Sequence, residues 1–239
     1  MASNNAIVAL TRGYKNINGY DSLLLRNNCL KNTVNKNNEY PLVLFHEGNI
    51  TLDHQNYIKE RSLGQDIHFV DISKDWSGGY EGMCRFQTYD IWSYCKEFNN
   101  VMRVDEDCLI QSCGENPFDL GDNVYLRSVY FAESHSETNA TLPQRIYELT
   151  GVEPSVFYNN KFVYTNVGLA NVGFWLEPKM NKLIKEIAHS DLQRANRWGD
   201  LPVLGSLLNI FAVGKVGYID GLTYKHLSHD NVITSNGVD

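Results

Sequence analysis

The sequence has no long hydrophobic run and no excess of positive charge. Its apolar stretches are far shorter than the span of about 20 residues that crosses a bilayer, so we expect no membrane span. Its formal net charge is −7 over 239 residues, whereas proteins that bind nucleic acids or anionic membranes generally present a basic face. Nucleic acid is therefore not an expected partner.

Neither the cysteines nor the first ten residues follow a pattern typical of secreted proteins. The five cysteines are odd in number, and none falls in the C-x-x-C spacing of redox and zinc motifs; they are Cys29, Cys84, Cys95, Cys108 and Cys113. We interpret them as reduced thiols. Residues 1–10 contain no basic segment followed by a long apolar stretch, so we expect no signal peptide and a cytoplasmic location.

No internal repeat and no Pro/Ser-rich linker interrupts the chain. With 43% hydrophobic and 21% charged residues, a chain of this length can bury a substantial core. We therefore predict a single domain over residues 1–239.

Short apolar segments alternate with helical patterns in the first part of the chain. Strands are predicted at residues 6–10, 42–45 and 67–72, and helices at 21–30 and 52–61, because apolar residues run continuously in the former and recur at helical spacing in the latter. This alternation favours an α/β fold with a mostly parallel sheet. Ligand sites in such sheets lie at the carboxyl ends of the strands.

The rest of the chain continues this alternation less regularly. A long helix is expected over 80–98, where apolar side chains recur at helical spacing along one side. It leads into a short strand at 101–104. Further strands are predicted at 124–132, 171–176 and 216–219, and further helices at 142–150, 178–189 and 201–211.

Three consecutive carboxylates follow the strand at 101–104. Asp105, Glu106 and Asp107 are costly to hold together unless they are solvated or share a cation. On an extended backbone Asp105 and Asp107 would point to the same side, where their oxygens would suit Mn²⁺ or Mg²⁺. The alternative interpretation is an acidic, solvated loop.

Other polar residues fall where the predicted sheet would bring them to the same edge. Arg12 and Gly13 end the first strand and are candidates to meet a nucleotide or a phosphate. His226 follows the last predicted strand and could complete a metal site through a neutral imidazole nitrogen. The alternatives are a surface salt bridge for Arg12 and a surface or capping role for His226. Together these residues suggest a metal-diphosphate site.

The segment 197–202, Arg-Trp-Gly-Asp-Leu-Pro, combines a helix start with residues that capping does not explain. Asp200 is placed to cap the helix that follows. Arg197 and Trp198 could form an anion clamp and a sugar platform. Two residues of the predicted long helix are interpreted either as core or rim residues or as substrate contacts: Tyr80 and Arg85.

Four blocks, in the same order along the chain, resemble the fungal α-1,2-mannosyltransferase family. Residues 80–86 (Tyr-Glu-Gly-Met-Cys-Arg-Phe) are similar to its tyrosine-x-x-methionine-cysteine-arginine-phenylalanine block, and residues 103–107 (Arg-Val-Asp-Glu-Asp) to its arginine-valine-glutamate-proline-aspartate metal motif. Residues 197–203 nearly match its arginine-tryptophan-glycine-aspartate-alanine-proline-valine segment, and residues 218–226 resemble its aspartate-rich turn that ends in a histidine. The blocks span almost the whole chain.

The resemblance implies a GT-A fold and the activity of a family of GDP-mannose-dependent Golgi enzymes. Position by position, it implies that Asp105 and His226 hold manganese, with Asp107 nearby. It places Tyr80, a catalytic candidate, near the donor phosphate and Arg12 near the nucleotide. The residues assigned to the nucleotide sugar are Arg12, Gly13, Arg85, Arg197 and Trp198.

The chain departs from the family at three positions that matter for function. Asp105 replaces a glutamate and Glu106 replaces a proline, which changes the length of the ligand and the shape of the turn. The triplet 171–173 (Asn-Val-Gly) is aligned with an asparagine-phenylalanine-glutamate whose glutamate lies at the family's reaction centre, and Gly173 has no side chain to act. This leaves both a retaining and an inverting course open. For an inverting displacement, Asp200, at a helix N-terminus that keeps it ionised, is the candidate general base.

The predicted function is a metal-dependent glycosyltransferase that moves a sugar from a nucleoside-diphosphate donor to a hydroxyl of a glycan or glycoprotein. The donor is GDP-mannose by resemblance, or a UDP-sugar such as UDP-xylose, and the cofactor is Mn²⁺ or Mg²⁺. The nucleotide-binding part is expected at residues 1–110 and the acceptor-side part at residues 111–239. Two alternatives stay open: a sugar-1-phosphate nucleotidyltransferase, for which residues 12–15 are a poor phosphate loop, and a non-catalytic carbohydrate-binding protein, which Gly173 would allow.

Overall fold

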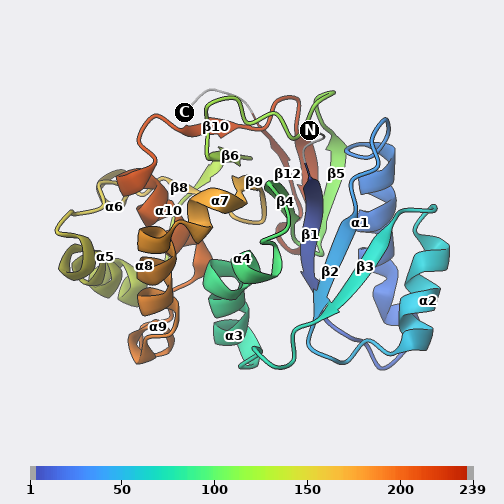
Figure 1. Cartoon of the computed structure of the whole chain (residues 1–239), viewed down its shortest axis with the longest axis horizontal. Helices are drawn as coiled ribbons and strands as arrows, with labels where there is room; N and C mark the ends of the chain where they lie inside the picture. Colours follow the sequence, from blue (N-terminus) through green and yellow to red (C-terminus); the bar gives the residue numbers. More distant parts are fainter. Residues whose placement is uncertain (1–3, 236–239) are drawn as a thin grey trace.

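A mixed sheet runs through the centre of the molecule, which the computed structural model describes over residues 4–235 (Figure 1). Its seven strands lie in the spatial order β10 (Val216–Tyr218), β6 (Tyr125–Arg127), β9 (Val167–Asn171), β4 (Asn100–Val104), β1 (Asn5–Thr11), β2 (Leu42–His46) and β3 (Ile67–Asp71). All neighbours are parallel except β9, which is antiparallel to both β4 and β6. The predicted α/β fold with a mostly parallel, mixed sheet is confirmed.

Two smaller antiparallel sheets and a set of helices complete the described residues. One small sheet contains β5 (Cys108–Ser112), β11 (Thr223–His226) and β12 (Asn231–Thr234), and the other contains β7 (Tyr130–Phe131) and β8 (Phe162–Val163). The helices are α1 (Asp21–Asn32), α2 (Leu52–Arg61), α3 (Gly79–Arg85), α4 (Ile91–Tyr94), α5 (Ser136–Thr150), α6 (Val156–Asn159), α7 (Val172–Leu176), α8 (Pro178–Ala188), α9 (Asp191–Ala195) and α10 (Asp200–Phe211). Within residues 4–235, none of these helices combines the length and the apolar composition that a membrane span requires.

Side chains alternate between the two faces of the sheet along each central strand. In β1, Ala6 and Val8 belong to the core that also contains residues of α4, α7, α8 and α10. Ile7 and Ala9 belong to the core shared with α1, α2 and β5. Figure 1 shows α1 and α2 on one side of the sheet and α8 and α10 on the other. The continuous apolar run at 6–9 therefore reflects a strand that is buried on both faces.

The strand predicted at 171–176 is wrong. The structure has β9 up to Asn171 and the short helix α7 from Val172 onward. Asn171 caps this helix, because its side-chain oxygen accepts a hydrogen bond from the Phe174 backbone N–H at 2.9 Å. The aromatic and β-branched residues after Asn171 favour a strand by composition, but the cap and the surrounding core hold them in a helix.

Three other elements differ from the prediction. The helix expected at 80–98 ends at Tyr94 and contains a π-helical turn at Phe86–Asp90 between α3 and α4. The strand expected at 124–132 is divided into β6 and β7. The strand expected at 216–219 is followed by β11 and β12 rather than being the last. This final hairpin is important because β11 carries a predicted metal ligand.

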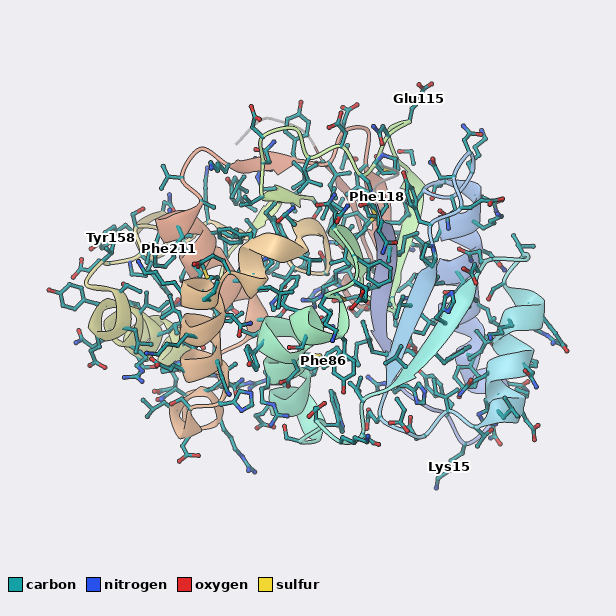
Figure 2. All side chains as sticks on the ribbon, in the orientation of Figure 1. Lys15, Phe86, Glu115, Phe118, Tyr158 and Phe211 are labelled. Atoms are coloured by element: carbon teal, nitrogen blue, oxygen red, sulfur yellow. The ribbon has the colours of Figure 1, made fainter. Side chains whose placement is uncertain are left out.

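The carboxyl ends of β1, β2 and β4 lie at one edge of the central sheet, as their parallel pairing requires. These strands end at Thr11, His46 and Val104. Because these ends lie together, the loops after β1, β2 and β4 can share a site. Figure 2 shows Lys15, which follows β1, at the bottom of the view and Glu115, which follows β5, at the top, so the loop after β5 lies on the opposite side of the molecule.

Gly168 of β9 offers a direct test of the sheet register. A Cβ at this position would lie 2.0 Å from the hydroxyl oxygen of Tyr125 on the neighbouring strand β6. We expect Gly168→Ala to lower the free energy of unfolding by about 1–3 kcal/mol, because the buried Tyr125 ring has to move. Urea denaturation measures the change.

The matched control is Gly173→Ala, in an identical Asn-Val-Gly triplet five residues later. Gly173 is exposed in α7, and its nearest neighbour would lie 3.3 Å from a Cβ. This substitution should be neutral or stabilising by up to about 1 kcal/mol, since alanine favours a helix over glycine. Equal stability of the two variants would contradict the pairing of β9 with β6.

Candidate active site

The three consecutive carboxylates form a tight turn between β4 and β5. A backbone hydrogen bond of 3.1 Å to the Asp105 carbonyl closes the turn, so the expectation that Asp105 and Asp107 share one side of an extended backbone is wrong. Glu106 accepts hydrogen bonds from the Thr11 hydroxyl and, at 2.6 Å, from the Tyr14 hydroxyl. Each carboxylate therefore has its own partners, and Glu106 connects the turn to the end of β1.

Asp107 faces His226, the last residue of β11. Its Oδ2 lies 3.3 Å from the imidazole Nε2 and accepts a hydrogen bond, also of 3.3 Å, from the Ser228 backbone N–H. The hydrogen bond to His226 is the main reason why the pKa of Asp107 lies well below its usual range. The His226 side chain is 7% exposed and that of Asp107 is 33% exposed, so the pair opens to solvent on the carboxylate side.

This pair is suited to a divalent cation. An ionised carboxylate and an imidazole nitrogen are common metal ligands, and the two segments that carry them are held together by the pairing of β11 with β5. The Tyr164 hydroxyl lies 3.0 Å from the other imidazole nitrogen, Nδ1, and contacts of this kind orient metal-binding histidines. The structure thus brings two predicted metal ligands, Asp107 and His226, together, and their chemistry fits a metal.

Asp105 belongs to a second cluster, built around Arg103 of β4. Asp105 Oδ1 lies 3.1 Å from both Nε and Nη2 of the guanidinium, and Asp200 Oδ2 lies 2.5 Å from Nη1. Burial works against the charged form of Arg103, but the two carboxylates outweigh it and raise the pKa of Arg103 above its ordinary value. Asp105, a predicted metal ligand, therefore has one of its two oxygens engaged by Arg103.

Asp200 is the first residue of α10 and not its cap. Gly199 occupies the N-cap position, and the Asp200 side chain points to Arg103 on the central sheet with only 10% exposure. The predicted capping role is wrong because the ion pair uses the carboxylate. The helix start nevertheless places Asp200 beside Arg103 and Asp105.

Tyr80 and Arg197 lie on the exposed side of this second cluster. The Arg197 guanidinium lies over the Tyr80 ring, 5.1 Å from its centroid, and both residues are exposed. A Cβ at Gly199 would lie 3.2 Å from the Tyr80 hydroxyl, so the phenol approaches the start of α10 closely. Partial burial raises the pKa of Tyr80, and its hydroxyl therefore stays protonated at neutral pH.

Trp198 and Arg85 are engaged inside the protein. Trp198 is 1% exposed, and its indole N–H donates to the Thr141 hydroxyl at 2.9 Å. It has no face to offer a sugar, so the platform assigned to it is wrong. Arg85 donates to the Asp90 carboxylate at 3.0 Å and to the Asp75 carbonyl. These contacts connect α3 to neighbouring segments and occupy the guanidinium that was assigned to the nucleotide sugar.

Arg12 and Gly13 lie just past the end of β1, as predicted. The Gly13 backbone N–H donates to the Asn49 side-chain oxygen at 3.0 Å, and a Cβ at Gly13 would lie 2.4 Å from the Asn49 carbonyl oxygen. The loops after β1 and β2 therefore touch at a position that requires glycine. The Arg12 side chain is exposed beside this contact.

The triplet at 171–173 lies at the opposite edge of the sheet from the carboxylates. Because β9 is antiparallel to β4, Asn171 pairs with the first residue of β4. The same Asn-Val-Gly sequence occurs at 166–168, where Gly168 pairs with Arg103. The register therefore places Gly168, and not Gly173, on the strand end that carries Arg103 and the carboxylates.

Arg103 and the aromatic residues beside His226 were not predicted as site residues. An arginine inside an apolar strand is a signal that could have identified Arg103, since a buried guanidinium needs carboxylate partners. Phe131, 42% exposed, stacks on Tyr164 with ring centroids 4.4 Å apart, and Tyr164 contacts His226. No local pattern connects these residues, because they come together only through the pairing of strands.

Comparisons with known proteins support the fold. No protein-family model and no curated protein sequence matches the chain. Solved structures similar to it include core-mannan synthase A from Aspergillus fumigatus in its Mn/GDP form (14% identity, TM-score 0.75, covering 94% of this chain and 75% of that one). The mannosyltransferase Ktr4p from S. cerevisiae in complex with GDP is similar too (14%, TM-score 0.78, 94% and 71%), as is mouse xyloside xylosyltransferase 1 (11%, TM-score 0.58, 90% and 85%). At these identities the likeness shows the fold alone, which is the predicted GT-A-like fold.

Proposed function

We propose that the chain is a metal-dependent glycosyltransferase that transfers a sugar from a nucleoside-diphosphate donor to a hydroxyl of a glycan or glycoprotein. The observation that carries the proposal is the contact between Asp107 and His226, 3.3 Å apart, at the carboxyl edge of the central sheet. The shared fold supports it, because structural neighbours are described as mannosyl- and xylosyltransferases. An edge of this kind is where α/β sheets bind nucleotides.

The proposed cofactor is Mn²⁺ or Mg²⁺, and its proposed ligands are Asp107 and His226. When bound, the ion neutralises charge on the departing nucleoside diphosphate. The hydrogen-bonded environment that lowers the pKa of Asp107 keeps this carboxylate ionised and ready for a cation. Asp105 is a further proposed ligand through Oδ2, since the hydrogen bonds from Arg103 are made to Oδ1.

Exposed cationic and phenolic groups are the proposed contacts of the donor. Arg12 and Arg197 present guanidinium groups, which bind phosphate oxygens well, at the rim of the carboxyl edge. Tyr80 offers a protonated hydroxyl beside Arg197. Gly13 keeps the loop after β1 close to the loop after β2, so that the two can bind one nucleotide.

Asp200 is the proposed general base, because neither Gly173, aligned with the family's carboxylate, nor Gly168, paired with Arg103, has a side chain that could act. Asp200→Asn should lower the transfer rate by about 10²- to 10⁴-fold, the usual contribution of a positioned base. The amide oxygen can still accept a hydrogen bond from Arg103, so binding of nucleoside diphosphate should change little. Steady-state kinetics with the acceptor, together with calorimetric titration of the nucleotide, separate the two effects. A near-normal transfer rate would leave Asp200 as a structural partner of Arg103.

GDP-mannose is the first donor to test. Two structural neighbours are described with GDP bound, and a third is a xylosyltransferase, which keeps a UDP-sugar such as UDP-xylose in the panel. The experiment follows nucleoside diphosphate released from each donor by the purified protein, with Mn²⁺ and with a chelator. We expect slow, metal-dependent hydrolysis of one donor. No release, and no thermal stabilisation by GDP or UDP with Mn²⁺, would contradict the proposal.

A second candidate function is a carbohydrate-binding protein without turnover. The specific observation in its favour is Gly168, which lacks a side chain beside Arg103. This function predicts that a glycan stabilises the protein against heat without any nucleotide or metal. Donor hydrolysis in the panel above excludes it.

A further inference from the structure

Asp107 and His226 have a third potential ligand beside them, the thiol of Cys108. Cys108 is the first residue of β5 and pairs with His226 across the antiparallel ladder to β11. A carboxylate oxygen of Asp107, the Cys108 sulfur and an imidazole nitrogen of His226 all lie within 4.8 Å of one another. The sulfur therefore lies close enough to share an ion with the other two groups.

One buried side chain, Asn166, contacts both this sulfur and the imidazole. The Asn166 side-chain amide nitrogen lies 3.4 Å from the Cys108 sulfur and 3.3 Å from His226 Nδ1. The orientation of this amide is fixed, because its oxygen accepts hydrogen bonds of 2.9 Å from the Tyr224 hydroxyl and from the Val167 backbone N–H. Asn166 thus contacts the sulfur and Nδ1 from the interior, and Asp107, whose side chain is 33% exposed, lies on the solvent side.

We propose that Cys108 joins Asp107 and His226 as a ligand when the bound ion is of the Zn²⁺ class, so that the site binds such ions through a thiolate. The inference rests on the metal site of the proposed function and adds its ion selectivity. A carboxylate, an imidazole and a thiolate form a typical zinc or cobalt donor set, whereas Mn²⁺ and Mg²⁺ favour oxygen. Binding releases the thiol proton to solvent, and three protein ligands leave an open position for a substrate oxygen.

A preference for Zn²⁺ over Mn²⁺ is not by itself evidence, because almost any site with nitrogen, oxygen and sulfur ligands follows that order. The diagnostic quantity is the change in the ratio of Zn²⁺ affinity to Mn²⁺ affinity when the sulfur is removed. Cys108→Ser keeps the size of the side chain and exchanges a soft ligand for a hard one. It should weaken Zn²⁺ binding by more than about tenfold and leave Mn²⁺ binding nearly unchanged.

The experiment titrates the metal-free protein with Co²⁺ alone, without any donor sugar, and records its absorption spectrum. We expect the near-ultraviolet charge-transfer band of a cobalt–thiolate bond in the unmodified protein. The band should be absent in Cys108→Ser and retained in Cys113→Ser. Cys113 is the matched control, because it comes directly after β5 and lies outside the cluster of Asp107, Cys108 and His226. Cobalt binding without the band, or a band that survives in Cys108→Ser, would overturn the inference.

A second measurement covers the case in which Cys108→Ser fails to fold. The X-ray absorption spectrum of the unmodified, zinc-loaded protein should show a sulfur neighbour at about 2.3 Å from zinc. Zinc surrounded only by nitrogen and oxygen, or no zinc binding at all, would overturn the inference. Donor hydrolysis with Mn²⁺ tests the proposed function separately, so either claim can fail without the other.

Discussion

Asp107→Asn should lower metal-dependent donor turnover by about 10²-fold or more, the cost of losing a group that holds charge at a reacting phosphate. The substitution removes the negative charge that faces His226 and with it the proposed attraction for the cation. The fold should be retained, because the Asp107 side chain is 33% exposed. Release of nucleoside diphosphate at increasing Mn²⁺ concentration measures the effect, which should include a weaker dependence on the metal.

The matched control for this variant is Glu106→Gln, in the same turn. Glu106 accepts a hydrogen bond from the Thr11 hydroxyl on one carboxylate oxygen and from the Tyr14 hydroxyl on the other. In the glutamine variant the remaining oxygen can accept one of these bonds, and the amide nitrogen can donate to the other hydroxyl, since a hydroxyl also accepts. The substitution removes one negative charge from the turn without removing a proposed ligand. Turnover near that of the unmodified protein is expected. If Asp107→Asn keeps its metal-dependent turnover, or if Glu106→Gln loses as much, the assignment of Asp107 is wrong.

The largest effect on stability is expected from Arg103→Met. The Arg103 and Asp200 side chains are 14% and 10% exposed, and Asp105 shares the same guanidinium. Breaking a buried ion pair on one side costs about 3–5 kcal/mol, because the remaining carboxylates lose their counter-charge. The raised pKa of Arg103, caused by these carboxylates against the effect of burial, indicates the same coupling. Urea denaturation gives the change in the free energy of unfolding.

Two further variants make this result interpretable. The double variant Arg103→Met with Asp200→Asn should recover part of the lost stability, because one of the uncompensated charges is gone. Arg145→Met, which breaks a pair whose side chains are 28% and 49% exposed, should cost less than about 1 kcal/mol. If Arg103→Met lowered the free energy of unfolding no more than Arg145→Met does, the claim that the ion pairs of Arg103 with Asp105 and Asp200 stabilise the fold would be wrong.

The fold could be predicted from the sequence where strands are buried on both faces. The continuous apolar runs that became β1 and β2 leave little choice of structure, and their parallel pairing follows from the helices between them. Prediction failed where a single side chain decides between two structures, as when Asn171 caps α7. It also failed for the break between β6 and β7 and for β8, which has only two residues and forms because it pairs with β7.

The candidate site could be predicted in part. Asp107 and the distant His226 were both predicted as metal ligands, and they lie side by side because β11 pairs with β5. Their environment could not be predicted, since the turn at 105–107 distributes its carboxylates among partners from β1, β4 and the loop after β11. The burial of Trp198 was also beyond the sequence, because its contact with Thr141 joins segments that no local pattern connects.

Anomalous diffraction from crystals grown with Mn²⁺ and GDP, and in parallel with UDP, tests the central claim most directly. We predict a manganese peak between Asp107 and His226, with the diphosphate next to it and the nucleoside at the ends of β1 and β2 beside Arg12. Manganese or nucleotide bound only elsewhere on the protein would contradict the account, whatever activity the protein shows.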